Sequence, residues 1–162
     1  MEKTFLELIS ENQSILFKIC NVYFREKVDK EDYHQELIIQ LWKAFPDFKN
    51  TAKFSTWMYR VCINAAIDIL RKEKKEIKKI SLSKEHLHHI PDYGYVTTGN
   101  QDRLYELISQ LSHVDRAIIT LYLEEYSYRE IAEIIGISES NTGVKINRIK
   151  SRILKSLKNG RC

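Results

Sequence analysis

The stretch SYREIAEIIGISESNTGVKINRIKSRI, residues Ser127 to Ile153, decides the fold of the C-terminal part of the chain. Ser127 and Glu130 have the spacing of a capping box, in which each side chain satisfies a backbone amide at the start of a helix. A helix is therefore expected to begin directly after the serine. Gly136 can adopt the left-handed conformation that ends this helix, and Ser138 can cap the next one. The sequence therefore predicts a helix-turn-helix, with a three-residue turn between two helices.

The second of these helices has an apolar side and a basic side. Ile146, Ile149 and Ile153 share one side, and cations at spacings of three, four and three share another: Lys145, Arg148, Arg152 and Lys155. From residue 143 to residue 162 the chain has seven Lys and Arg residues and no Asp or Glu, a net charge of +7 that suggests a polyanionic partner. A solvated amphipathic helix without a ligand is the alternative.

In a DNA-binding helix-turn-helix the second helix enters the major groove. We therefore expect the first residues of this helix to read base edges and the later cations to contact phosphates. The residues expected at double-stranded DNA are Ser138, Glu139, Ser140, Asn141, Thr142, Lys145, Arg148 and Arg152.

The composition is that of an ordinary globular protein in a reducing compartment. The chain has 162 residues, 43% of them hydrophobic and 30% charged, with a formal net charge of +4. Its three cysteines are far apart, and His86, His88 and His89 have poor spacing for a metal, so neither a disulfide framework nor a metal site is predicted. No signal peptide and no run of about 18 apolar residues is present, which predicts a cytoplasmic protein without membrane insertion.

Known catalytic and cofactor motifs are missing from the sequence. It contains no G-x-S-x-G, phosphate-binding loop, H-E-x-x-H or Gly-rich dinucleotide turn. We therefore expect a protein that is not an enzyme and that holds no cofactor.

The N-terminal half is also predicted to be helical. Helical spacing of apolar residues runs through residues 5–23, through residues 32–45 up to Pro46, and through a long stretch from about residue 57 to residue 80. Residues 81–102 contain one proline and two glycines and lose this periodicity, which is typical of a linker. The predicted fold is all-α, with two small helical domains at residues 1–80 and 103–162 joined by a flexible linker at 81–102.

The order of these motifs resembles the extracytoplasmic-function sigma factors of bacterial RNA polymerase, in the sigma-70 family. DYHQELIIQLWKAFPDFKNTAKFSTWMYRVCINAAIDIL, residues 32–70, resembles conserved region two of that family, and EEYSYREIAEIIGISESNTGVKINRIKSRI, residues 124–153, resembles region four. The resemblance covers nearly the whole chain except the linker. It implies a transcription initiation factor that binds core RNA polymerase, directs it to promoters, places its C-terminal helix on the minus-thirty-five element and captures the melted minus-ten strand.

The resemblance also implies a polymerase-binding helix in the first domain. Its expected contacts to the clamp coiled coil of the largest polymerase subunit are Asp32, Gln35, Glu36 and Gln40. From the residues alone, the solvated face of a core helix is the favoured interpretation of this polar strip, and the resemblance is what favours polymerase binding. The D-L-x-Q motif of the family reads Asp32-Tyr33-His34-Gln35 here, a departure expected to alter packing.

The resemblance assigns capture of single-stranded DNA to the loop and helix that follow. The residues expected there are Phe48, Lys49, Asn50, Lys53, Phe54, Thr56, Trp57, Arg60, Asn64 and Arg71. Interleaved rings, amides and cations suit splayed bases, although Phe54 and Trp57 are also plausible core anchors, the reading favoured for Trp57.

Asn50 stands where many relatives have glycine. Residues 71–84 carry seven cations against two acids, and we expect them near phosphates of the melted DNA, with a solvated tail as the alternative.

Two other functions fit parts of the sequence. One is a freestanding helix-turn-helix repressor, whose dimer would bind a palindrome without polymerase. The other is a helical adaptor that binds a protein and never contacts DNA. The sequence leaves the promoter bases open, and it also leaves open whether an anti-sigma factor is a further partner.

Overall fold

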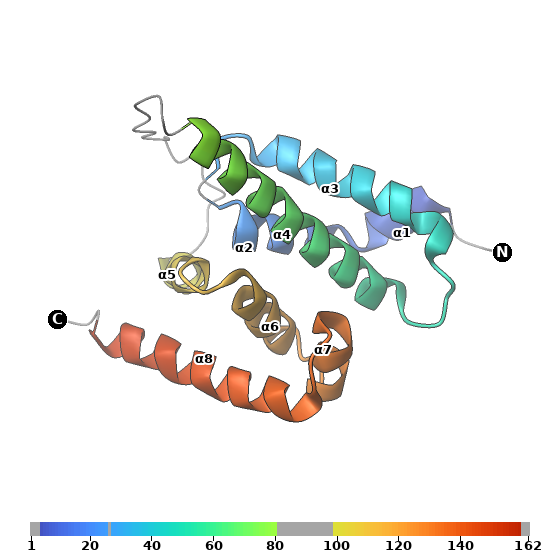
Figure 1. Ribbon diagram of the computed structural model, residues 1–162. Helices are drawn as coiled ribbons and strands as arrows, with labels where there is room; N and C mark the ends of the chain where they lie inside the picture. Colours follow the sequence, from blue (N-terminus) through green and yellow to red (C-terminus); the bar gives the residue numbers. More distant parts are fainter. Residues whose placement is uncertain (1–3, 26, 81–98, 160–162) are drawn as a thin grey trace. The chain divides into compact units, whose positions relative to one another are not determined.

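The computed structural model describes residues 4–25, 27–80 and 99–159 of the chain (Figure 1). All regular elements in these ranges are helices, which confirms the all-α prediction. The chain divides into two compact units, unit 1 (Met1–Gly94) and unit 2 (Tyr95–Cys162). Residues 81–98 of the expected linker, its three histidines and Cys162 lie outside the described residues. The last four residues of the expected linker belong to a helix that begins at Gly99. The predicted domain boundaries at residues 80 and 103 stay a prediction.

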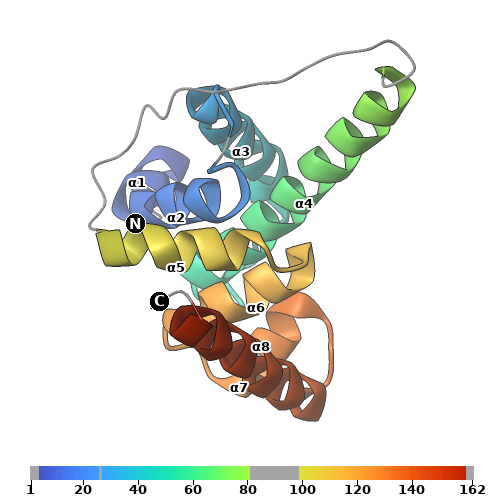
Figure 2. The ribbon, with the colours of Figure 1, turned by 90° about the vertical axis from the view of Figure 1, so that its left-hand side faces the viewer.

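Unit 1 consists of four α-helices and one short 3-10 helix. These are α1 (Phe5–Glu11), α2 (Gln13–Tyr23), α3 (Lys30–Ala44), η1 (Phe45–Asp47) and α4 (Phe54–Ile80). The helical pattern over residues 5–23 is divided at Asn12, whose side-chain amide donates to the Leu8 carbonyl at 2.8 Å. Helices α2, α3 and α4 pack against one another in pairs (Figures 1 and 2). Their core contains fully buried Leu16, Ile19, Leu37, Leu41, Met58 and Cys62.

Unit 2 consists of α5 (Gly99–Ser109), α6 (His113–Leu123), α7 (Tyr128–Ile135) and α8 (Glu139–Asn159). Helices α6, α7 and α8 pack against one another, and α5 contacts α6 and α8. The side chains at the centre of this packing are Ile118, Leu121, Ile131 and Ile146, all fully buried. Arg116 of α6 donates to the carbonyls of Leu111 and Ser109, which ties the end of α5 to α6. This core holds α8 by one side only.

The buried thiols of unit 1 give a first prediction. Burial raises the pKa of Cys20 from 9.0 to about 11, and burial also raises the pKa of Cys62. A rise of that size lowers the thiolate population of Cys20 at neutral pH about 100-fold, and the thiolate is the form that reacts with alkylating agents. In a Cys162→Ser variant, we therefore expect iodoacetamide to react at least about 100-fold more slowly with the folded chain than with the urea-unfolded chain. Equal rates, with circular dichroism showing an intact fold, would contradict the buried positions of both thiols.

Candidate nucleic-acid interface

Helices α7 and α8 are each capped at their start. The Ser127 hydroxyl accepts a hydrogen bond from the Glu130 amide at 3.1 Å, and the Ser138 hydroxyl accepts one from the Asn141 amide at 3.1 Å. Gly136 ends α7 with a φ of 84°, a left-handed conformation that glycine adopts without a steric penalty. The predicted helix-turn-helix and its three-residue turn are thereby confirmed.

The buried side of α8 is the predicted apolar side. Ile146, Ile149 and Ile153 are buried, and so is Thr142. The prediction for Thr142 as a DNA contact needs correction, because its side chain is fully buried and its hydroxyl donates to the Ser138 carbonyl at 2.9 Å. This threonine stabilises the start of α8 from inside. The other expected DNA contacts reach the surface: Ser138, Glu139, Ser140, Asn141, Arg148 and Arg152 are exposed, and Lys145 is half-buried.

The cations of α8 fall into two groups. The Lys145 ammonium lies 3.9 Å from the Asp115 carboxylate of α6, and the Lys150 ammonium donates to the Tyr122 hydroxyl at 3.2 Å. Lys150 also lies 5.1 Å from the Tyr122 ring centre, and the hydrogen bond to Tyr122 raises its pKa. Arg148 and Arg152 point away from the core and are exposed. The two arginines are therefore better placed for phosphates than Lys145 and Lys150.

Three further exposed residues share this side of α8 and were not singled out from the sequence. They are Val144, Asn147 and Ser151, at spacings of three and four residues. The spacing could have identified them, because Val144 and Ser151 lie four and three residues from Arg148, Asn147 lies three residues from Val144, and residues three or four apart share a helix face.

The loop of unit 1 that was expected to bind single-stranded DNA rests on packed aromatic rings. Phe48 lies 5.1 Å from Trp57 and 5.5 Å from Phe54 between ring centres, and Phe54 lies 5.3 Å from Trp57. All three side chains are half-buried, so each ring supports the loop and keeps part of its surface accessible. Phe45 of η1 joins the same cluster.

The polar residues of this loop lie at its surface. Lys49, Asn50 and Lys53 are exposed. Asn50 has a φ of 57°, in the left-handed region where asparagine is among the few tolerated residues besides glycine. Glycine adopts this conformation as readily, so either residue suits the loop at this position.

Helix α4 continues this surface away from the loop. Arg60, Asn64 and Arg71 are exposed at steps of four and seven residues, while Met58 and Cys62 face the core. Thr56 is half-buried in the first turn. The exposed residues Arg60, Asn64 and Arg71 therefore lie on one side of α4, away from the core.

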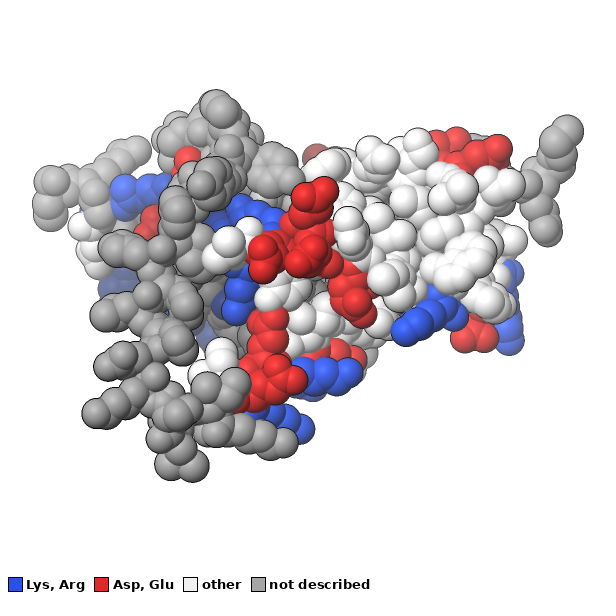
Figure 3. All heavy atoms as spheres, turned by 90° about the horizontal axis from the view of Figure 1, so that it is seen from above, with Lys and Arg blue, Asp and Glu red and all other residues white. Residues whose placement is uncertain are grey.

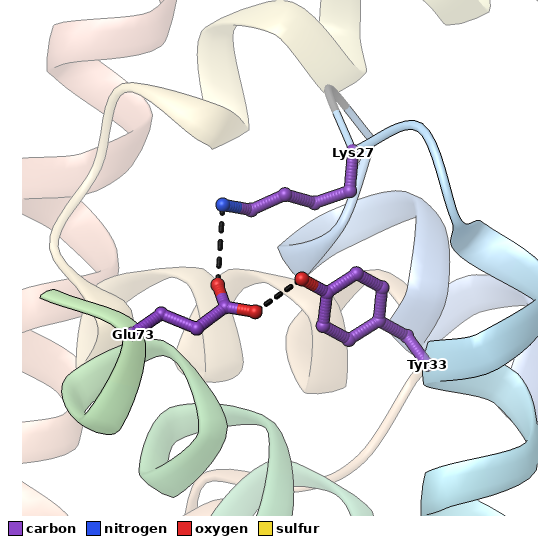
Figure 4. A network of polar contacts seen from close by, with 3 residues as sticks. All are labelled: Lys27, Tyr33 and Glu73. Carbon is purple, nitrogen blue, oxygen red and sulfur yellow. Dashed lines mark hydrogen bonds and ion pairs between the residues drawn. The ribbon is translucent and has the colours of Figure 1, made fainter. Parts of the chain in front are cut away.

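The C-terminal half of α4 is anchored by a polar network that the sequence did not reveal. Figure 4 shows the Glu73 carboxylate between the Tyr33 hydroxyl, which donates to it, and the Lys27 ammonium at 3.2 Å. The Tyr33 ring stacks on Phe24, with ring centres 4.2 Å apart. Burial, together with the hydrogen bond to Glu73, raises the pKa of Tyr33, so the hydroxyl stays a donor at neutral pH.

This network orients the basic end of α4. It joins the start of α3 and the preceding loop to one side of α4, and the cations Arg71, Lys72, Lys74 and Lys75 on the other sides are exposed. Residues 81–84 of the expected basic stretch lie outside the described residues.

The outer face of α3 mixes polar and apolar side chains. Asp32 and Gln35 are exposed, whereas Glu36 and Gln40 are half-buried and share a hydrogen bond of 2.8 Å. Trp42 lies beside this strip and is 62% exposed, with its ring centre 5.1 Å from that of Phe5 in a T-shaped contact. Ile39 is also exposed. Figure 3 shows acidic side chains gathered beside a broad area without charged residues on the face of unit 1 that contains α3.

Two family models match the chain. Sigma-70 region 2 matches residues 8–76, and Sigma-70, region 4 matches residues 101–157. The chain is 24% identical to the ECF RNA polymerase sigma factor SigW of Bacillus subtilis (strain 168), over 97% of this chain and 90% of that protein. It is 27% identical to RNA polymerase sigma factor SigV of the same organism, over 93% and 84%.

The chain is a member of the sigma-70 family, of the extracytoplasmic-function type. Two solved structures share the fold of this sigma factor. One is the sigma factor RpoE in complex with the anti-sigma factor NepR from Bartonella quintana, with a TM-score of 0.73 and 19% identity over 94% of this chain and 95% of that one. The other is CnrH in complex with the cytosolic domain of CnrY, with a TM-score of 0.64 and 18% identity over 98% and 89%.

Two other features are absent from the part of the sigma factor that the structure describes. No group of three or more His, Cys, Asp and Glu side chains in these ranges is arranged to hold a metal ion. In the same ranges, no helix has both the length and the apolar character needed to cross a membrane.

The exposed Arg148 of this sigma factor gives a prediction about salt dependence. A phosphate contact releases about one counterion, so we expect Arg148→Ala to weaken promoter binding by the polymerase holoenzyme and to flatten its log-log salt slope by about one unit. Lys150→Ala is the matched control, because it removes the same charge from the same helix but its ammonium is held by Tyr122. An unchanged slope for Arg148→Ala would remove this arginine from the DNA interface.

Proposed function

We propose that this sigma factor binds core RNA polymerase in the cytoplasm and directs it to specific promoters, where it captures the melted minus-ten strand. The observation that carries the proposal is a capped helix-turn-helix with exposed arginines in unit 2, in the same chain as an exposed cationic loop on aromatic rings in unit 1. A repressor or an adaptor needs only one of these surfaces. The protein supplies binding free energy for initiation and catalyses no reaction of its own.

Unit 2 takes double-stranded DNA at the minus-thirty-five element in this proposal. The exposed start of α8, Ser138 to Asn141, faces base edges, and Arg148 and Arg152 contact phosphates. Lys145 can leave Asp115 for a phosphate at little cost, because a partly exposed ion pair contributes little stability. Thr142 is left out of this set.

Unit 1 takes the melted strand. Lys49, Asn50 and Lys53 at the loop surface attract the backbone and hydrogen-bond to base edges, while the accessible parts of Phe48 and Phe54 stack on bases. Trp57 mainly supports both rings. Stacking on a protein ring contributes about 1–3 kcal/mol per base, which offsets part of the cost of unpairing. Arg60, Asn64 and the arginine-lysine end of α4 extend the track along the strand.

The outer face of α3 takes the polymerase. Asp32 and Gln35 supply exposed polar contacts, and the hydrogen bond between Glu36 and Gln40 fixes the orientation of the neighbouring pair. Trp42 adds a large exposed ring two turns from Gln35, and tryptophan is enriched among the residues that dominate interface energies. We include it with Ile39 in this surface.

An anti-sigma factor is the regulatory partner that we propose. Both solved structures of similar fold are titled as complexes: RpoE with the anti-sigma factor NepR, and CnrH with the cytosolic domain of CnrY.

The proposed function is tested by run-off transcription with sigma-free core polymerase of the source organism. Templates are genomic promoter fragments that include the region upstream of the protein's own gene. We expect start sites that appear only when the chain is added. Folded protein that neither co-sediments with core polymerase nor yields a new transcript would leave the repressor and the adaptor as the remaining functions.

Co-sedimentation with core polymerase also tests the proposed polymerase-binding surface through a variant. Trp42→Ala removes the exposed ring, and we expect it to weaken binding to core polymerase about 30-fold, the effect of a typical interface hot spot. Ile77→Ala, at a similarly exposed apolar position on α4, is the matched control. Equal binding by both variants would exclude Trp42 from the contact with polymerase.

A further inference from the structure

Val144 is an exposed apolar residue in the first half of α8, where the fold gives it no packing role. Its side chain is 54% exposed. It lies two residues after Thr142 and two before Ile146, both fully buried, so it points about 200° around the helix axis from each of them. The side chain therefore projects away from the core of unit 2.

The exposed residues around Val144 are polar or cationic. Residues three and four positions away on the same face are Ser140, Asn141, Asn147 and Arg148, all exposed. Valine has a lower helix propensity than most residues that could occupy an exposed helical position, because its branched side chain is restricted in a helix. Neither packing nor helix stability accounts for an apolar side chain here.

The chemistry of the major groove offers a ligand for such a side chain. Valine has no donor or acceptor for a phosphate or for the polar edge of a base. The C5-methyl group of thymine is the apolar feature of the groove, and apolar side chains recognise it by contact. Residues in the first turns of the second helix are the ones that reach base edges in a helix-turn-helix.

We propose that Val144 reads the C5-methyl group of a thymine in the minus-thirty-five element, which makes it a specificity-determining residue of this sigma factor. The proposal rests on the proposed function, in which α8 lies in the major groove. Arg148, one turn further along the same face, contacts the backbone while the valine contacts the base. The exposed amides of Asn141 and Asn147 flank the valine and are free to read neighbouring polar edges.

The test replaces thymine by deoxyuridine, which lacks only the methyl group and keeps every hydrogen-bonding edge. The probe is a promoter that gave a new start site in the run-off assay, with each thymine of the minus-thirty-five region on either strand replaced in turn. Binding by holoenzyme reconstituted with the full chain is measured for the wild type and for Val144→Ala. Leu154→Ala is the matched control, because Leu154 is 56% exposed on the same helix but lies about 15 Å further along the axis.

We expect the affinity of the wild type to fall about fourfold when deoxyuridine replaces one or two particular thymines, because one buried methyl group contributes about that much. Val144→Ala should bind the thymine and deoxyuridine forms of those positions equally, and Leu154→Ala should keep the wild-type sensitivity. The assignment of Val144 would be overturned if wild-type affinity did not change when any thymine is replaced by deoxyuridine. It would also be overturned if Val144→Ala kept the full wild-type loss. In both cases transcription from the same promoter would still uphold the proposed function. Absence of promoter-specific binding by the wild-type holoenzyme would overturn both.

Discussion

Burial of one side of α8 against α6 and α7 is the constraint on which the DNA-binding surface depends. Ile146 is fully buried, as are Ile118, Leu121 and Ile131 of the two helices it packs against, and removing a buried side chain of this size costs about 2–5 kcal/mol. That cost prevents rotation of the helix about its axis. Since each residue is offset by about 100°, the buried stripe fixes which side chains face outward, and these include Val144 and Arg148. The specificity of the surface is therefore set by the core.

Unit 1 meets a different requirement, because its aromatic rings both hold the loop and face the proposed ligand. Phe48, Phe54 and Trp57 contact one another, and each remains half-buried. Mutual packing keeps the rings in place before any strand binds, which lowers the entropy lost on binding. Exposed Lys49 and Lys53 surround rings that are already positioned.

Features with a local physical cause could be predicted from the sequence. The caps at Ser127 and Ser138, and the left-handed Gly136, each depend on residues within four positions along the chain, and all three are present. The left-handed conformation of Asn50 was not predicted, although it too has a local cause, the tolerance of asparagine for positive φ. Helical periodicity identified the buried isoleucines of α8 for the same reason.

Features that depend on the neighbouring helices could not be predicted in this way. Thr142 is a different case: it was assigned to the DNA surface from its place near the helix start, but its spacing of four from Ile146 was a signal in the sequence for the buried side. Trp42 lies about 100° around the helix axis from fully buried Leu41, and the neighbouring helices leave it largely exposed. The network of Lys27, Tyr33 and Glu73 joins residues 40 positions apart, and no sequence pattern marks such a contact. It gives a partner to the tyrosine that departs from the family's D-L-x-Q motif.

Permanganate oxidation of unpaired thymines tests the central claim most directly, namely that this chain opens promoter DNA when bound to core polymerase. A promoter fragment is treated with core polymerase alone, with the chain alone and with both. The account predicts a short patch of reactive thymines around the minus-ten element only when both proteins are present. Reactive thymines with core polymerase alone, or duplex DNA that stays unreactive while holoenzyme is bound to it, would contradict the account.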